Sequence, residues 1–448
     1  MRNFWAISLA LLATACGGPA LVADLGGDAA PAGSAAPRTY AADPRGWSRA
    51  EILARSAEVL AEAAGDGSTV DRFTAFAAGP DPDPAGTREI ARQALGRLVK
   101  RDPERRGAGQ GAALAADRAK VEAIASGRVA PATAPAREPI AFPRDEGAHW
   151  DALTEWWYLN GHLAGGAERF GFEFTLFRVG PLLYFAHVAL TDETGKRFHY
   201  VREWYTPGKT ASADKALDVR YGPHRIHATA PGAYAMTGVA GKGTGFDLQL
   251  ASRKQPMLIN GDGNIDMPEG KDSRYYSLTR MDAGGTVTVG GRRLAVTGLV
   301  WLDHQWGPFY VSGFKERWDW FSVQLDDGTD YNLFAFRAAD GTPLARHVNK
   351  LDARGAYRGG GRLELGRDTW WQSPRTGLRY TTRWTLDLPD AGERIAVETV
   401  LPEQEVARYF AFPIDPLPQY WEGRMRATKT RADASRSGGV AYCETFGF

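Results

Sequence analysis

The middle of the chain holds the densest group of side chains capable of chemistry. Residues 298–307 read GLVWLDHQWG and bring Asp303, His304 and Trp306 close together in sequence. An apolar, β-branched run leads into this stretch and a Gly-Pro pair follows it, which is typical of a strand that ends in a turn. We therefore predict that the three side chains lie at the end of a strand or in the turn just after it, where a sheet can hold them towards a ligand.

A second group lies about 150 residues earlier in the sequence, where residues 147–161 read GAHWDALTEWWYLNG. It contains His149 and places Glu155 directly before Trp156 and Trp157. An ionised carboxylate needs a partner when aromatic rings shield it from water. Two interpretations stay open. Glu155 pairs with an arginine or accepts hydrogen bonds from a turn while the tryptophans pack, or Glu155 faces a ligand cavity.

Trp318, Asp319 and Trp320 follow one another in a third stretch, which is predicted to be a strand. Successive side chains of a strand point to opposite faces, so Asp319 faces away from both tryptophans. Core packing is the simpler interpretation of the tryptophan pair. Asp319 is a candidate acid if its face is that of a cavity.

Several common kinds of site are excluded by the residue types and their spacing. His224 and His227 lie beside a Gly-Pro break, but no compact set of His, Cys and carboxylate residues has the spacing of a zinc site. The sequence has no G-x-S-x-G elbow, no phosphate-binding loop and no dinucleotide fingerprint in a β-α-β context. We therefore predict no metal and no cofactor.

Composition indicates a globular protein rich in β-structure. The formal net charge of +1 gives no global field to attract nucleic acid, so we predict no nucleic-acid partner. The chain has 14 Trp, 16 Tyr, 20 Phe and 52 Gly. Large flat side chains together with frequent turns favour an all-β core with aromatic-lined interiors.

The pattern of short strands predicts two β-domains in the second part of the chain. Phe170, Phe172 and Phe174 alternate with smaller or polar residues, which indicates a half-buried strand. Similar runs follow at intervals of about ten residues, as in a closed or nearly closed antiparallel barrel or sandwich. The pattern restarts after the Gly-Pro pair that ends the first stretch. We predict one barrel over residues 141–308 and another over residues 309–448.

The first third of the chain is predicted to be different in kind. Residues 1–15 have the plan of a secretory signal peptide and end at Cys16 in a sequence resembling a lipobox, so we expect lipid attachment at Cys16. Residues 16–46 are predicted to be a disordered tether. Residues 47–140 are predicted to form an α-helical extension and a Pro-rich linker, with helices starting near Ser48 and Thr87 and a third over about residues 112–126.

Taken together, the two tryptophan-rich groups resemble the carotenoid 1,2-hydratase and AttH-like family of secreted bacterial proteins. The segment Tyr420-Trp421-Glu422-Gly423 is similar to a motif near the end of that family. The resemblance covers about residues 142–448. It implies an all-β core of two lipocalin-like antiparallel β-barrels with an apolar ligand site, preceded by the signal peptide, the tether and the helices.

The resemblance also implies a reaction, the addition of water across an isolated carbon-carbon double bond of an acyclic carotene. This needs an acid to protonate the alkene, a site that tolerates a carbocation, and a base for the water. Tryptophan faces attract positive charge. His304 and Trp306 match the His-x-Trp pair of the hydratases. Tyr331 matches the first residue of a Tyr-x-Asp pair, but Leu333 replaces its Asp.

From these arguments we expect Asp303, His304 and Tyr331 to be catalytic. The expected ligand-binding residues are Glu155, Trp156, Trp157, Trp301, Trp306, Asp319 and Trp320. We expect the partners to be an isoprenoid or lipid molecule, a membrane through the anchor at Cys16, and an ABC-type transporter in the alternative case of a lipid carrier that has no catalytic activity. The expected place is the periplasmic side of the outer or inner membrane, and the expected state is a monomer.

Overall fold

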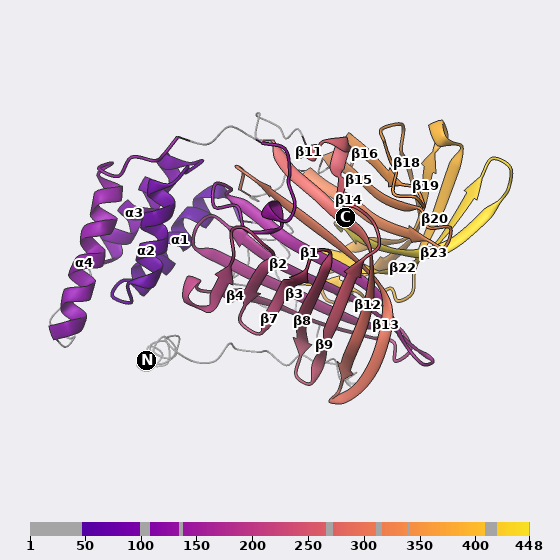
Figure 1. Ribbon diagram of the computed structural model, residues 1–448, viewed down its shortest axis with the longest axis horizontal. Helices are drawn as coiled ribbons and strands as arrows, with labels where there is room; N and C mark the ends of the chain where they lie inside the picture. Colours follow the sequence, from indigo (N-terminus) through magenta and orange to yellow (C-terminus); the bar gives the residue numbers. More distant parts are fainter. Residues whose placement is uncertain are drawn as a thin grey trace, which may run out of the picture.

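The computed structural model describes residues 47–98, 108–133, 138–265, 272–310, 316–338, 340–407 and 419–447. They form a group of helices, a first curled sheet and a second curled sheet, which follow one another along the longest axis of the molecule (Figure 1). The predicted signal peptide, the tether and Cys16 lie outside the described residues. Within the described residues, no helix is both long and apolar enough to cross a membrane.

Among the described residues, four α-helices precede the sheets. They are α1 (Arg49–Ala63), α2 (Ser68–Ala78), α3 (Pro84–Leu98) and α4 (Ala108–Ala125). A capping box between Ser48 and Glu51 starts α1, as the sequence predicts. The helix predicted from Thr87 begins earlier, at Pro84, because a proline fits the first turn, where its missing N–H needs no partner. α2 is not among the predicted helices, and no side-chain cap marks its start.

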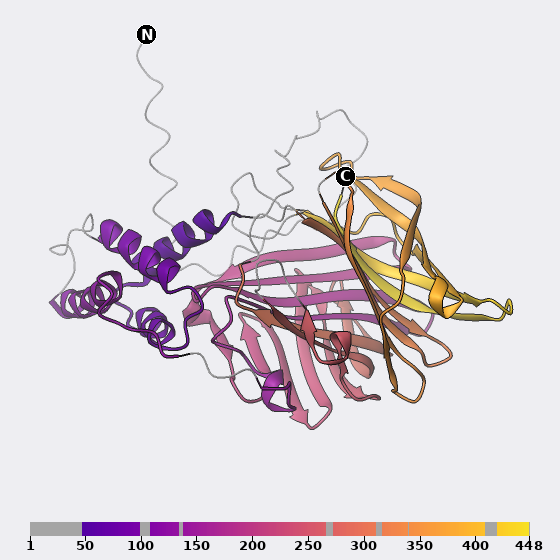
Figure 2. The same cartoon turned by 90° about the horizontal axis from the view of Figure 1, so that it is seen from above.

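The helices pack against the first sheet rather than extending away from it (Figure 2). One apolar cluster joins Leu60 of α1 and Phe73 of α2 to Phe185 of the sheet and to Phe309, which follows the sheet's last strand. All four side chains are buried. The helical segment and the first sheet therefore share one core.

The first sheet is antiparallel and curls into a barrel. Its strands are β1 (Thr154–Gly165), β2 (Glu168–Val179), β3 (Leu183–Asp192), β4 (Arg197–Tyr205), β5 (Thr210–Ser212), β6 (Asp218–Tyr221), β7 (His224–Ala230), β8 (Ala233–Gly241), β9 (Thr244–Ser252), β10 (Met257–Leu258), β11 (Asn264–Ile265), β12 (Ser273–Val289) and β13 (Arg292–Gly307). The main path runs in the order β4-β3-β2-β1-β13-β12-β9-β8-β7-β6-β5, and the short strands β10 and β11 pair with β12. The curl brings β3 and β4 back into contact with β8.

The second sheet is also antiparallel and curled. Its strands are β14 (Glu316–Leu325), β15 (Asp330–Ala338), β16 (Pro343–Leu351), β17 (Tyr357–Gly359), β18 (Glu364–Gln372), β19 (Arg379–Leu388), β20 (Glu393–Thr399), β21 (Glu405–Val406), β22 (Tyr420–Arg431) and β23 (Arg436–Thr445). The main path runs in the order β17-β16-β15-β14-β23-β22-β20-β19-β18, and the short strand β21 pairs with β22. Each sheet encloses its own apolar core, so the predicted all-β fold of two lipocalin-like barrels is confirmed.

Side chains alternate along β13 between the interior of the first barrel and the junction between the barrels. Leu302 and Trp306 point into the core of the first barrel. Trp301 belongs to a different apolar cluster that includes Trp320 of the second barrel. The odd-numbered side chains of this part of β13 therefore face the junction between the barrels, while the even-numbered ones face the first barrel's interior.

Candidate functional site

A cavity of about 150 Å³ lies between the two barrels, with walls formed mostly by aromatic side chains. This is room for roughly ten water molecules, since a site for one needs about 10–15 Å³. Its aromatic residues are Trp156, Tyr158, Phe177, Tyr275, Phe309, Trp318, Trp320, Phe334, Phe336, Tyr420 and Phe446. Asp303, Glu422 and Glu444 also line it, and no lysine or arginine of the described chain does. The cavity thus combines an apolar wall with acidic groups.

Asp303 reaches the cavity from β13 and is held there by hydrogen-bond donors. Tyr275 donates its hydroxyl to Oδ2 at 2.5 Å, and the Trp301 indole N–H donates to Oδ1 at 2.7 Å. The Ser277 hydroxyl also donates to Oδ1. The pairing of β12 with β13 places Ser277 directly opposite Asp303, so the sheet itself fixes this geometry. The carboxyl group is thereby oriented on rigid elements rather than on a loop.

Burial changes the proton affinity of the acidic residues in this cavity. It raises the pKa of Asp303 to about 7, although the hydrogen bonds from Ser277, Tyr275 and Trp301 act in the opposite direction. Burial likewise raises the pKa of Glu444 to about 7, against a hydrogen bond from Trp318 and with a contribution from the charge of Asp303. A carboxyl group with a pKa near neutrality can give or take a proton under ordinary conditions.

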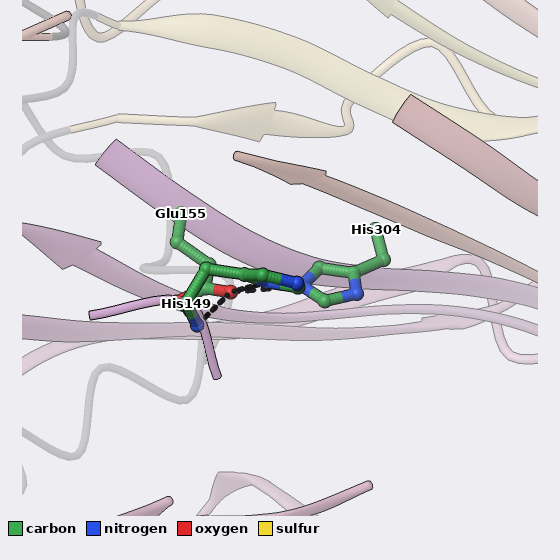
Figure 3. Close-up of side chains that lie close together, drawn as sticks. All are labelled: His149, Glu155 and His304. Carbon is green, nitrogen blue, oxygen red and sulfur yellow. Dashed lines mark hydrogen bonds and ion pairs between the residues drawn. The ribbon is translucent and has the colours of Figure 1, made fainter. Parts of the chain in front are cut away.

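His304 is the next residue of β13 and faces the opposite way, into the first barrel. Its Nε2 lies 3.0 Å from Oε1 of Glu155, and its Nδ1 lies 3.1 Å from the backbone oxygen of Asp145. His149 Nδ1 lies 2.9 Å from the same Glu155 oxygen, so both rings converge on one carboxylate (Figure 3). Arg178 donates to the other Glu155 oxygen at 3.0 Å. Of the two interpretations of Glu155, the structure supports pairing with an arginine and a turn.

Three donor atoms of His149, Glu155 and His304 lie within 4.8 Å of one another, which raises the question of a metal ion. Zinc uses such side chains at about 2.0–2.1 Å from the ion. Here the two imidazole nitrogens lie at hydrogen-bonding distances from the carboxylate, which Arg178 also engages. The group satisfies its own polar atoms and ties the segment before β1 to the barrel wall.

The structure does not bring together Asp303, His304 and Tyr331, the three residues that the sequence predicts to be catalytic. Asp303 and His304 lie on opposite faces of β13, because neighbouring residues of a strand alternate. Tyr331 lies in the core of the second barrel, where its hydroxyl donates to Glu393 at 2.7 Å. Leu333, the residue in place of the expected Asp, belongs to that same core. An acid at this position would not face the cavity between the barrels.

The expected ligand-binding residues are divided among three places. Trp156 and Trp320 line the cavity, and Trp301 supports Asp303 beside it. Trp157 and Trp306 lie in the first barrel, stacked on the rings of His304 and His149. Asp319 lies in the second barrel and forms ion pairs with Arg337 at 3.3 Å and Arg367 at 2.6 Å. Asp319 is therefore buried away from the cavity that Trp320 lines.

Sequence reasoning missed Tyr275, Ser277 and Glu444. Each comes from a strand far from Asp303 in sequence or from an unremarkable stretch, and only strand pairing brings Ser277 to Asp303 and the other two to the cavity. Glu422 carried a signal, because it lies in the Tyr-Trp-Glu-Gly motif. The sequence predicts that Glu422 and Trp421 point to opposite faces of their strand. It does not predict which of these two faces lines the cavity.

Two curled antiparallel sheets, each around its own core and with a cavity between them, define a protein of tandem lipocalin-like barrels. The chain belongs to the AttH-like family, whose model matches residues 133–448. The match begins after α4, so the helices precede the part that defines the family. No curated protein matches the sequence at a significant level.

Solved structures agree with this assignment. A protein of Nitrosomonas europaea described as AttH has 25% sequence identity and a TM-score of 0.61, over 69% of this chain and 98% of that one. Kievitone hydratase of Nectria haematococca has 14% identity and a TM-score of 0.57, over 69% and 93%. The second likeness shows a shared fold.

Proposed function

We propose that this protein is an enzyme that adds water to a carbon-carbon double bond of an apolar molecule, an isoprenoid or a lipid, in the cavity between its barrels. The observation that carries the proposal is Asp303, a buried carboxyl group that faces an aromatic cavity with a pKa of about 7. Protonation of an alkene requires a correctly placed acid that still carries its proton at neutral pH, and a partly protonated carboxyl in an apolar wall meets that requirement.

The aromatic wall supports the same reaction. Proton transfer to an alkene leaves a carbocation, and the faces of aromatic rings attract positive charge. Trp156, Trp318 and Trp320 line the cavity together with Asp303. No lysine or arginine of the described lining opposes a developing positive charge. The cavity would hold the reacting end of the substrate, a segment of roughly ten non-hydrogen atoms by its volume.

Water labelled with heavy oxygen tests the proposal. The purified protein is incubated with geraniol, an acyclic isoprenoid of suitable size, and with an acyclic carotene. We expect a hydrated product that carries the label, and a loss of at least about a hundredfold in Asp303→Asn. Asp282→Asn, the same change at an exposed ion pair with Arg253, serves as the control and should keep full activity.

Tight binding of these probes without any labelled product, in both the wild type and Asp303→Asn, would instead support the alternative of a lipid carrier. That alternative draws on the same apolar cavity but gives Asp303 no chemical role. It would work beside an ABC-type transporter.

For the place of action, the proposal is a lipoprotein anchored through Cys16 on the periplasmic side of a membrane. Its support is the sequence before Cys16 alone. Metabolic labelling with a radioactive fatty acid tests it. Wild-type protein should carry the label and sediment with membranes, and Cys16→Ser should lose both properties.

A further inference from the structure

The second barrel contributes a pair of carboxyl groups to the cavity that the proposed role of Asp303 leaves unused. Glu422 of β22 and Glu444 of β23 are direct neighbours in the pairing of those strands, and both line the cavity. Two ionised carboxylates directly opposite each other repel, and burial strengthens the repulsion. The pair therefore retains at least one proton near neutral pH.

The hydrogen bonds around the pair are incomplete in one place. The Tyr158 hydroxyl bonds to Glu422, and the Trp318 indole bonds to Glu444. Glu422 is only 1% exposed, so water outside the protein does not reach it. Its Oε1 atom nevertheless has no hydrogen-bond partner among the described residues. A buried polar atom without a partner costs about 1–3 kcal/mol, so such atoms normally meet a water or a ligand. Glu422 lines the cavity, so the cavity's contents can supply such a partner.

Glu444 differs from Glu422 in how readily it changes charge. Its pKa of about 7 leaves a large ionised fraction at neutral pH. Burial and the charges of Glu173 and Glu444 hold the pKa of Glu422 well above its usual range, so Glu422 keeps its proton. The negative charge of Asp303 contributes to the raised pKa of Glu444, so the protonation of the two groups is linked.

We propose that Glu422 holds the attacking water in the cavity and that Glu444 takes the proton which this water releases. The inference rests on the proposed hydration, in which Asp303 supplies the other proton. Acid and base then come from different barrels, Asp303 from β13 and Glu444 from β23. The junction between the domains is thus the site of both proton transfers.

The steps balance. The Asp303 O–H bond breaks and a C–H bond forms at one alkene carbon, while the π bond breaks and leaves a carbocation at the other. The water oxygen forms a C–O bond to that cation, and its proton moves to the Glu444 carboxylate. Asp303 ends ionised and Glu444 protonated, so one proton must return from Glu444 to Asp303 before the next turnover.

The test separates the two proton transfers by label. Geraniol is incubated in heavy water that also carries heavy oxygen, and recovered substrate and product are analysed by mass spectrometry. Transfer from Asp303 followed by return of a proton leaves deuterium in the alkene without added oxygen. Wild type should give product with both labels. Glu444→Gln should lose oxygen addition by at least about a hundredfold while deuterium exchange continues.

Glu422 is tested by two substitutions. Glu422→Leu should lose most oxygen addition and keep deuterium exchange, while Glu422→Gln, which can still hold a water, should lose less. Glu398→Gln, at an exposed position of β20, is the control for the change itself. The thermal midpoint of each variant reports its folding.

Oxygen addition within about threefold of wild type in Glu444→Gln would overturn the assignment of the base. So would an equal loss of both labels, because that would place Glu444 in the first proton transfer. If wild type incorporates neither label while Asp303 titrates near neutrality, the proposed function itself fails, and this result is distinct from the other two.

Discussion

Asp303 and His304 are consecutive residues of β13, yet they serve different parts of the molecule. Asp303 lies opposite Ser277 and faces the cavity between the barrels, whereas His304 contacts Glu155 inside the first barrel. Strand alternation alone causes this separation. This short motif therefore supplies the carboxyl group of Asp303 to the cavity and the imidazole of His304 to the hydrogen bonds inside the first barrel.

The His304 side of the motif should matter for stability. Glu155→Gln leaves Arg178, which is 1% exposed, without its charged partner. Removing one member of a buried ion pair costs about 3–5 kcal/mol of the free energy of unfolding, and chemical denaturation measures it. Glu168→Gln breaks an exposed pair with Arg292 and should cost no more than about 1 kcal/mol. Equal effects of the two changes would contradict a supporting role for the Glu155 group.

The Asp303 side should set the pH dependence of activity. An acid must be protonated to act, so the rate of hydration should fall as the pH rises above about 7, the pKa of Asp303. The proposed base Glu444 must be ionised and its pKa is also about 7, so the rate should fall on the acid side as well and peak near pH 7. A pH-rate profile with a saturating probe measures this, and a rate that keeps rising above pH 7 would contradict Asp303 as the proton donor.

The free energy of unfolding should also depend on the titration of Asp303. The folded-state pKa of Asp303 is raised above its unfolded value, so its protonated form contributes stability that is fully present below about pH 4. This contribution is lost as the pH rises towards and through about 7. The difference in free energy of unfolding between wild type and Asp303→Asn should therefore shift against wild type from pH 4 to pH 8. A constant difference would contradict the raised pKa.

Tyr275 influences the pKa of Asp303 through a hydrogen bond. Its hydroxyl donates to Oδ2 of Asp303 at 2.5 Å and lowers the pKa of that carboxyl. Tyr275→Phe should therefore move the falling limb of the pH-rate profile to higher pH. A limb that stays in place, or moves to lower pH, would show that this hydrogen bond does not stabilise the carboxylate.

The aromatic wall should favour a cationic ligand of the right shape. A tertiary ammonium analogue of geraniol should bind more tightly than its neutral isopropyl isostere by about 2- to 30-fold, the range expected for cation-π contacts. Isothermal titration measures both. Trp320→Leu should reduce this preference, because Trp320 lines the cavity. Equal affinity for the two compounds in wild type would argue against carbocation stabilisation.

Much of the fold could be predicted from the sequence, because its signals are local. The alternating phenylalanines of β2 and the capping box at Ser48 report on residues close in the chain. The helix α2 was missed for the same reason, since Gly67 provides no side-chain cap.

The site could be predicted only in part. Asp303 and Trp320 were recognised by type and setting, but their association depends on which faces of β13 and β14 meet between the barrels. Strand alternation implies that Asp303 and His304 diverge, yet it does not say which one faces a cavity. The support from Tyr275 and Ser277 depends on the pairing of β12 with β13, a long-range register that no local pattern encodes.

Infrared difference spectroscopy tests directly, and without any substrate, whether Asp303 is a partly protonated acid at neutral pH. Spectra of wild type and Asp303→Asn are recorded across a pH titration, and their difference isolates the carbonyl band of protonated Asp303. We expect this band to disappear with a midpoint near pH 7. A midpoint near 4, the ordinary value for an aspartate, would contradict it.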